Sequence, residues 1–257
     1  MSTSNPEPGD FMDTMSHHYN LFLVALSYVI SVLGSFTALK LCRQHAGARG
    51  AEKWRSLLAG ALAMGAGAIW SMHFIGMLAF DMGMPVAYDV PITLASLLVA
   101  VVVTGLGIYV VGKGPTSPWR LIGGGTAMGL GVAAMHYTGM AAMRMQAHLV
   151  YDLVIVAISL GIAVVASIAA LWLVFNTTRL WQIVASALVM GLAVCGMHYT
   201  GMKAAIIRHD AALPAQVLGL SPEILAYLIF LVTLVILSLA SLLGSDRQAI
   251  AIRRTAP

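Results

Sequence analysis

The chain has 257 residues, of which 60% are hydrophobic and only 9% are charged, and its formal net charge is +4. Soluble domains carry about 25% charged residues, so this composition excludes a water-soluble globule and predicts an all-α integral membrane protein. The apolar runs are continuous, which favours helices over the alternating strands of a membrane barrel. The few basic residues give no case for a nucleic-acid partner.

Residues 1–19 form a polar, acidic segment, which we expect to be an outer N-terminal tail. No basic stretch precedes the first apolar run, so that run is not expected to be a removable signal peptide. His17 and His18 lie in this tail. They could hand a metal inward or be solvated tail residues.

Residues 20–243 are predicted to form a membrane domain of seven transmembrane helices. A helix needs about 20 apolar residues to cross a bilayer. The stretches that meet this length are 20–40, 56–80, 91–111, 120–143, 152–175, 181–203 and 223–243. The remaining residues, 244–257, are expected to be a short cytoplasmic tail.

The basic residues predict the orientation. If the N-terminus lies outside, eleven basic residues face the cytoplasm: Lys40, Arg43, Arg49, Lys53, Arg55, Lys113, Arg120, Arg179, Arg247, Arg253 and Arg254. Only three then face outward: Arg144, Lys203 and Arg208. By the positive-inside rule this bias predicts an outer N-terminus and an inner C-terminus in a bacterial inner membrane.

One pattern, Met-His-aromatic-x-Gly-Met, occurs near the ends of the second, fourth and sixth stretches. Its copies are Met72–Met77, Met135–Met140 and Met197–Met202, and their histidines are 63 and 62 residues apart. In the predicted orientation all three stretches run outward. His73, His136 and His198 should therefore lie at one depth near the periplasmic face and face a common interior, since an imidazole in lipid lacks partners.

The repeat extends beyond the motif. Tyr19-Asn20, Tyr88-Asp89 and Tyr151-Asp152 open the three inward stretches at the same place in each unit. The chain therefore reads as three parallel two-helix repeats plus a seventh helix. Met64-Gly65 lies one residue farther from its histidine than the equivalent pairs at Met128 and Met190, so the first unit does not superpose simply.

Each motif offers a soft ligand set. Residues four apart share a helical face, so the histidines should project with Met77, Met140 and Met202. The preceding Met72, Met135 and Met197 point about 100° away. Imidazoles and thioethers suit copper, Cu(I) above all, and all nine residues are candidate ligands. Structural histidines copied with a duplicated hairpin are the alternative.

Other polar residues have two readings each. Asn20, Asp89 and Asp152 could accept hydrogen bonds from ligand histidines or cap their own helices. Cys195, three residues before His198, could be an extra soft ligand or a small helix residue. Cys42 lies at the far end of the first stretch, too distant for a disulfide with Cys195. His45, His148 and His209 are expected in loops.

The motifs resemble the MHYT family of bacterial integral-membrane sensor modules. Residues 135–138 and 197–200 spell the family's name, and Met72-His73-Phe74 is its first-copy variant. The resemblance extends over roughly residues 17–243, including Leu26-Ser27-Tyr28 and the Trp70–Phe74 run. It implies a copper site near the outer membrane face and sensing of oxygen, carbon monoxide or nitric oxide.

Such modules often precede domains that make or degrade cyclic di-GMP, whereas only about 14 residues follow the seventh stretch here, too few for an enzyme domain. We therefore expect a stand-alone sensor without catalytic activity that signals through a separate partner. Two alternatives remain: a copper or metal transporter, and a haem protein with two histidine ligands. Optical spectra and metal analysis would distinguish them.

Overall fold

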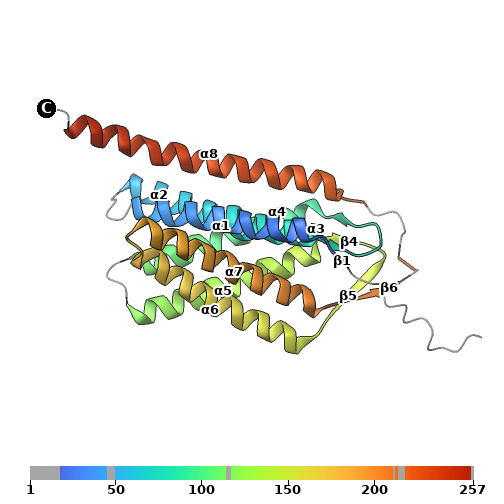
Figure 1. The fold of residues 1–257 in the computed structure, drawn as a ribbon. Coiled ribbons are helices and arrows are strands. Elements are labelled where there is room, and N and C mark those ends of the chain that lie inside the picture. Colours follow the sequence, from blue (N-terminus) through green and yellow to red (C-terminus); the bar gives the residue numbers. More distant parts are fainter. Residues whose placement is uncertain (1–17, 45–49, 114–116, 211, 214–217, 256–257) are drawn as a thin grey trace, which may run out of the picture.

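A computed structural model describes residues 18–44, 50–113, 117–210, 212–213 and 218–255 (Figure 1). Each apolar stretch expected from the sequence coincides with a helix or a continuous helical run. These are α1 (Leu21–Gln44), α2 (Ala51–Ala61) continuing through the π-helix η1 (Leu62–Trp70) into α3 (Ser71–Leu78), α4 (Val90–Val111), α5 (Pro118–Ala141), α6 (Leu153–Asn176), α7 (Leu180–Ala204) and α8 (Pro222–Thr255). Helix α8 continues past residue 243, where the sequence predicted its end.

The surface of the helices is that of a membrane protein. Large apolar side chains point outward along them: Leu153 is 77% exposed and Leu98 is 64% exposed. An apolar surface of this extent is not stable in water. Five helices in the described residues are long and apolar enough to cross a membrane: α1, the run Ala51–Leu78, α4, α6 and α7. Helix α8 adds a shorter apolar stretch, Pro222–Ile236.

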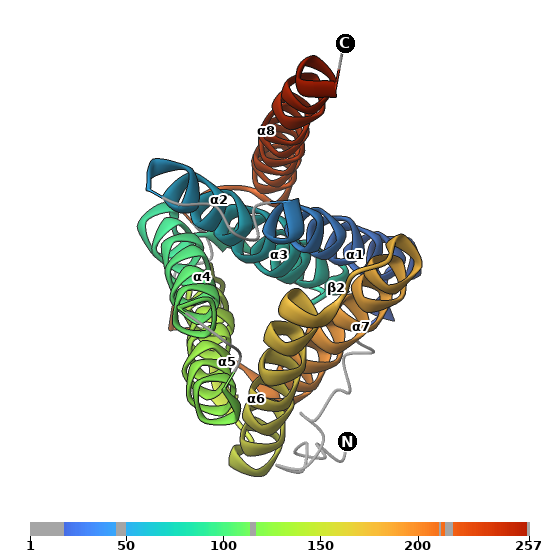
Figure 2. The same cartoon turned by 90° about the vertical axis from the view of Figure 1, so that its left-hand side faces the viewer.

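The helices form a ring of three hairpins. Helix α1 packs against the α2–η1–α3 run, α4 against α5, and α6 against α7. The ring closes through contacts of η1 with α4, of α5 with α6, and of α7 with α1. Figure 2 shows this ring end-on, with α8 outside it against the first hairpin. Helix α8 contacts η1, α3 and α1.

A short antiparallel ribbon joins the two ends of each hairpin, and the sequence analysis did not anticipate it. The pairs are β1 (His18–Tyr19) with β2 (Phe80–Asp81), β3 (Ala87–Tyr88) with β4 (Met143–Arg144), and β5 (Ala147–Tyr151) with β6 (Ala205–His209). The backbone N–H groups of Asn20, Asp89 and Asp152 donate to the carbonyls of Ala79, Ala142 and Ala204 at 2.8, 2.8 and 2.9 Å. We call this end of the bundle the ribbon end.

The π-helix η1 explains why the first unit has one extra residue. Met64 precedes His73 by nine residues, whereas Met128 precedes His136 by eight. A π-helical segment accommodates one additional residue in a helix. The Ser71 hydroxyl marks the widened turn by donating to the carbonyl of Ala66, five residues earlier, at 2.8 Å. The insertion is therefore absorbed before the motif begins, and His73 keeps the place of its equivalents.

Candidate metal centre

The motif histidines lie on three different hairpins at the same distance from the ribbon end. His73 is in α3, His136 in α5 and His198 in α7. These helices end at Leu78, Ala141 and Ala204, which are five, five and six residues after the respective histidines. Because the ribbons hold all three hairpin ends in the same way, the imidazoles enter the ring at one level.

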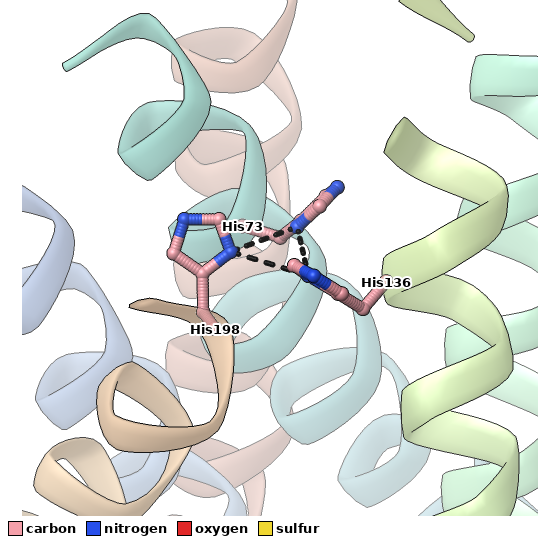
Figure 3. Close-up of side chains that lie close together, drawn as sticks. All are labelled: His73, His136 and His198. Carbon is pink, nitrogen blue, oxygen red and sulfur yellow. Dashed lines mark hydrogen bonds between the residues drawn. The ribbon is translucent and has the colours of Figure 1, made fainter. Parts of the chain in front are cut away.

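The three imidazoles meet inside the ring (Figure 3). Their Nδ1 atoms form a triangle with sides of 3.0 Å (His73 to His198), 3.1 Å (His136 to His73) and 3.3 Å (His198 to His136). The residues are 1%, 0% and 0% exposed, respectively, for His73, His136 and His198. The structure therefore brings together the three histidines that the sequence analysis expected to share an interior.

A glycine from another hairpin makes room for each imidazole. A Cβ atom on Gly139 would overlap Nε2 of His73. A Cβ atom on Gly201 would overlap Nε2 of His136, and one on Gly76 would overlap Nε2 of His198. The motif glycine of each unit thus lies against the histidine of a neighbouring unit. The three contacts have the same direction around the ring, so each unit gives one glycine and one histidine to them.

The tautomers of the three imidazoles decide what the triangle can bind. With one or two protons on Nδ1, an Nδ1–H group can donate to a neighbouring Nδ1 lone pair. A neutral imidazole carries one N–H. If each proton is on Nδ1, three N–H groups point at one another. If each is on Nε2, three lone pairs converge, and the Nε2 atoms are buried with no hydrogen-bond partner among the described residues. With every proton on Nε2, a cation at the centre of the triangle would use all three Nδ1 lone pairs.

The six motif methionines are all buried, at 5% exposure or less. Met77 lines a cleft of about 550 Å³ at the ribbon end. Met197 lines a cavity of about 30 Å³ away from that end. These two thioethers therefore lie on opposite sides of the imidazole layer. As ligands, the six methionines stay a prediction.

A serine from the next hairpin positions the aromatic residue of two motifs. Tyr137 Oη is 2.7 Å from Ser159 Oγ, and Tyr199 Oη is 2.9 Å from Ser27 Oγ. Each serine donates its own proton to a backbone carbonyl three residues earlier, at 2.7 Å. The tyrosines are therefore the donors, since a hydroxyl has one proton. The serines lie seven residues after Asn20 and Asp152, a periodicity that the sequence analysis missed.

The first motif has Phe74 in place of a tyrosine and obtains the same bond another way. Ser96, seven residues after Asp89, occupies the equivalent position in α4 and donates to the Thr93 carbonyl at 2.7 Å. The indole Nε1 of Trp70 donates to Ser96 Oγ at 3.1 Å. Because Trp70 is one helical turn before Phe74, it reaches the serine that a phenylalanine cannot bond.

Asn20, Asp89 and Asp152 cap their helices, which answers the question that their sequence pattern left open. The Oδ1 atom of Asn20 accepts from the Phe22 and Leu23 amides, and Asp152 from Val154 and Ile155. Asp89 accepts from Ile92 at 3.0 Å and pairs with Arg144 at 2.6 Å. The hydrogen bond from Arg144, followed by that from the Ile92 amide, lowers the pKa of Asp89.

The remaining candidates lie away from the imidazole triangle. Among the described His, Cys, Asp and Glu side chains, the cluster that could hold a metal consists of the three motif histidines. Cys195 is buried beside Ser27, and both cysteines are free thiols. His148 pairs with Asp210 at 3.0 Å, outside the ring. His17 and His45 fall outside the described residues.

The spacing of the nitrogens limits what the site can hold. A haem with two histidine ligands needs a porphyrin plane between the imidazoles, and nitrogens 3.0–3.3 Å apart leave no room for one. Three converging imidazole nitrogens could hold a single transition-metal ion.

A comparison with protein-family models finds three consecutive matches to the MHYT model, described as a bacterial signalling protein N-terminal repeat. They cover residues 67–124, 129–187 and 191–253. Each match begins in a helix that carries a motif and includes the helix that follows. No solved structure matches the chain.

Curated relatives with similar sequences are signalling proteins. The chain is 44% identical over 240 residues to the bifunctional diguanylate cyclase/cyclic di-GMP phosphodiesterase MucR of Pseudomonas aeruginosa, covering 90% of this chain and 35% of that protein. It is 35% identical to the cyclic di-GMP phosphodiesterase NbdA of the same species and 34% identical to the signalling protein YkoW of Bacillus subtilis. Both alignments cover 77% of this chain, and 26% and 25% of those relatives. The chain thus spans about a third or less of the length of these proteins.

Proposed function

Because this chain belongs to the MHYT family of bacterial signalling proteins, we propose that it is a membrane sensor built around one metal ion. His73, His136 and His198 hold the ion, and the sensed quantity is a diatomic gas (oxygen, carbon monoxide or nitric oxide) or the redox state of the metal. The proposed role is sensing and not catalysis.

The observation that carries this proposal is the triangle of Nδ1 atoms. A point equidistant from three nitrogens 3.0–3.3 Å apart lies about 1.8 Å from each, close to the roughly 2.0 Å of a histidine–metal bond. A slight opening of the triangle would accommodate an ion. With a metal on Nδ1, the remaining proton is on Nε2, which lies against the backbone of a motif glycine from another hairpin.

We propose copper as the metal. Imidazole binds several transition metals, but soft thioethers favour Cu(I). Each motif supplies two thioethers, from Met72, Met77, Met135, Met140, Met197 and Met202. Bound copper would supply a redox couple and an open coordination position for a gas. The chain holds the ligands, excludes water from them and fixes each ring against a glycine.

The proposed setting is a bacterial inner membrane crossed seven times, with an outer N-terminus and an inner C-terminus. Helix α5 and the apolar part of α8 then join the five helices that qualify by length and composition. The ribbon end is periplasmic in this arrangement. The signal passes to a separate partner, and the names of MucR and NbdA make cyclic di-GMP turnover the first output to examine.

Metal analysis of the purified, copper-loaded protein tests the proposal. We expect one copper ion per chain in the wild type and a loss of most of that copper in the His73→Ala, His136→Ala and His198→Ala variants, because two imidazoles hold the ion less tightly than three. His148→Ala is the matched control, since His148 pairs with Asp210 outside the ring, and it should keep its copper. Equal copper in all variants, or none in the wild type, would contradict the proposal.

Gas addition separates sensing from transport. Carbon monoxide or nitric oxide should change the spectrum of the reduced, copper-loaded wild type and leave that of His136→Ala unchanged. Proteoliposomes should show no copper flux that depends on His198. If flux is lost in His198→Ala and no gas alters the spectrum, the protein is a transporter.

A further inference from the structure

An apolar pocket of about 30 Å³ lies within the ring of helices and is partly open to the outside, since Ala166, Ala170 and Ala193 in its lining are half-buried. Its walls come from η1, α5, α6 and α7. We call it the inner chamber. It is separate from the cleft at the ribbon end, and of the motif residues Met197 lines it.

The chamber lies next to the imidazole layer, on the side away from the ribbon end. Ile69, Val132 and Val194 line it, and each precedes a motif histidine by four residues. Residues four apart share a helical face, so these three side chains form a layer one turn below the imidazoles. Met64, Met128 and Met190 line the chamber farther along the same helices. The chamber therefore lies near the axis on which the three histidines converge.

The chamber is unsuited to a second metal ion. Its lining offers four thioethers (Met64, Met128, Met190 and Met197) but no imidazole, thiolate or carboxylate. Two of the four sulfur atoms are engaged elsewhere: the Ser35 hydroxyl donates to Met64 Sδ at 3.9 Å. The Sδ atom of Met128 packs so closely on α4 that a Cβ on Gly107 would lie 2.9 Å from it. Besides the methionine sulfur atoms, the lining contains one polar side-chain group, the hydroxyl of Ser167.

The same lining disfavours water and charged ligands. A buried water makes about three hydrogen bonds, and one hydroxyl does not provide them. A bare anion in this lining would have no charged partner, which is costly. Apolar cavities in proteins bind apolar molecules such as xenon. The chamber volume of about 30 Å³ exceeds the roughly 10–15 Å³ needed for one water-sized molecule, which leaves room for a slightly longer one.

We infer that the inner chamber is the docking site of the sensed molecule, an uncharged apolar diatomic gas that reaches the imidazole layer from there. This inference rests on the proposed function for the identity of the gas, whereas the occupancy of the chamber does not depend on metal. Small apolar molecules dissolve in the bilayer, so they are available at this depth. A hydrated ion is not, because charge at this depth is expensive.

Xenon and two chamber-filling variants test the occupancy. Ala166 on α6 and Ala193 on α7 line the chamber. Ala166→Leu and Ala193→Leu should each fill it, from different helices. If one variant misfolds, the other still tests the inference. The control is Ala169→Leu, which adds the same side chain at an exposed position of α6. In metal-free protein, the ¹²⁹Xe NMR shift of the wild type and the control should saturate with xenon pressure. Both filled variants should lose this response.

The second measurement uses copper-loaded protein and follows gas binding by stopped flow. We expect the filled variants to keep their copper and to bind carbon monoxide at least tenfold more slowly than the wild type and Ala169→Leu. Identical xenon responses in wild type and filled variants would overturn the inference, as would unchanged binding rates. Failure of the wild type to retain copper, with the xenon response intact, would overturn the metal proposal and leave the chamber as a site for apolar gas.

Discussion

The imidazole triangle depends on three positions that have no side chain. Gly76, Gly139 and Gly201 each lie against Nε2 of a histidine from another hairpin. The histidine and the glycine of one motif therefore serve two different contacts: the histidine enters the triangle, and the glycine holds the ring of the neighbour. Any side chain at the glycine would push that neighbouring ring out of the triangle, because the interior has no free volume next to it.

Gly139→Ala should therefore impair the metal site through His73, although Gly139 is itself no ligand. We expect at least a tenfold loss of copper affinity, or about 1.4 kcal/mol, with the helical content unchanged. Gly196→Ala is the matched control, since a Cβ at Gly196 of α7 meets no atom within 4 Å. A competition titration with a Cu(I) chelator measures both. Equal affinities in the two variants would show that the glycine does not position the ring.

At the scale of elements, the three units are equivalent although their sequences are not equally spaced. The extra residue of the first unit is taken up by η1, and the missing hydroxyl of Phe74 is replaced by the indole of Trp70. Both adjustments lie within two helical turns of His73. Their common effect is to keep the first motif in register with the other two.

Deletion of one residue tests the role of the π-helix. Removing Gly67 from η1 should convert the segment into an α-helix with the Met-to-His spacing of the other units, so copper binding should be retained. Removing Leu130 from α5, between Met128 and His136, should rotate the two parts of that helix by about 100° relative to each other and abolish the site. Copper analysis of both purified variants is the measurement. Loss of copper in both would mean that the π-helical turn itself is required.

The cap of α4 gives a prediction on pH. The carboxylate of Asp89 accepts from Arg144 at the ribbon end, and its pKa is lowered, first by that bond and then by the Ile92 amide. A lowered pKa in the folded state stabilises the protein above the unfolded value of about 3.9, and this contribution is lost as the pH falls through the folded value.

Asp89→Asn keeps a capping side chain but removes the ion pair. It should lower the unfolding temperature at pH 7, by a small amount because Arg144 is half-exposed. The difference from the wild type should shrink as the pH falls below about 4. Arg144→Gln should show the same trend, and the double variant should be no less stable than either single one. A constant difference from pH 7 to pH 3 would contradict the role of the ion pair.

At the scale of the whole molecule, α8 breaks the threefold arrangement. It packs on the first hairpin, where Thr233 Oγ1 donates to Ser71 Oγ at 3.1 Å, and Ser71 in turn bonds the widened turn of η1. The run Ala51–Leu78 is enclosed, with 89% of its apolar 18-residue core buried, against 39% or less for the other four candidate spans. Of the three motifs, the first is thus the one directly beneath α8.

The predicted orientation of the molecule rests on the distribution of charge and can be measured with reporter fusions. Eleven basic residues against three predict that fusions after residues 48, 116 and 250 are cytoplasmic. Those after residues 86, 147 and 212 should be periplasmic, on the side of the ribbon end. An inverted pattern would place the metal site near the cytoplasmic face and contradict the proposed topology.

The sequence by itself determined the membrane class, the helical stretches, the threefold repeat and the identity of the three histidines. These are local properties: composition, the length of apolar runs and the spacing of a motif can each be read without knowing how helices pack. The π-helix was foreshadowed by the one-residue offset at Met64. The capping role of Asn20, Asp89 and Asp152 was one of two readings that the sequence allowed.

Tertiary structure alone decided the partners. Several features depend on how different hairpins pack against one another. They are the contact of His73 with Gly139, the hydrogen bond from Tyr137 to Ser159, the packing of α8 on the first hairpin and the chamber below the imidazoles. Helices with apolar residues all round carry no polar stripe that would reveal their rotation. Their facing side chains are set when the hairpins close into a ring, because only then do small residues and polar groups find positions that fit.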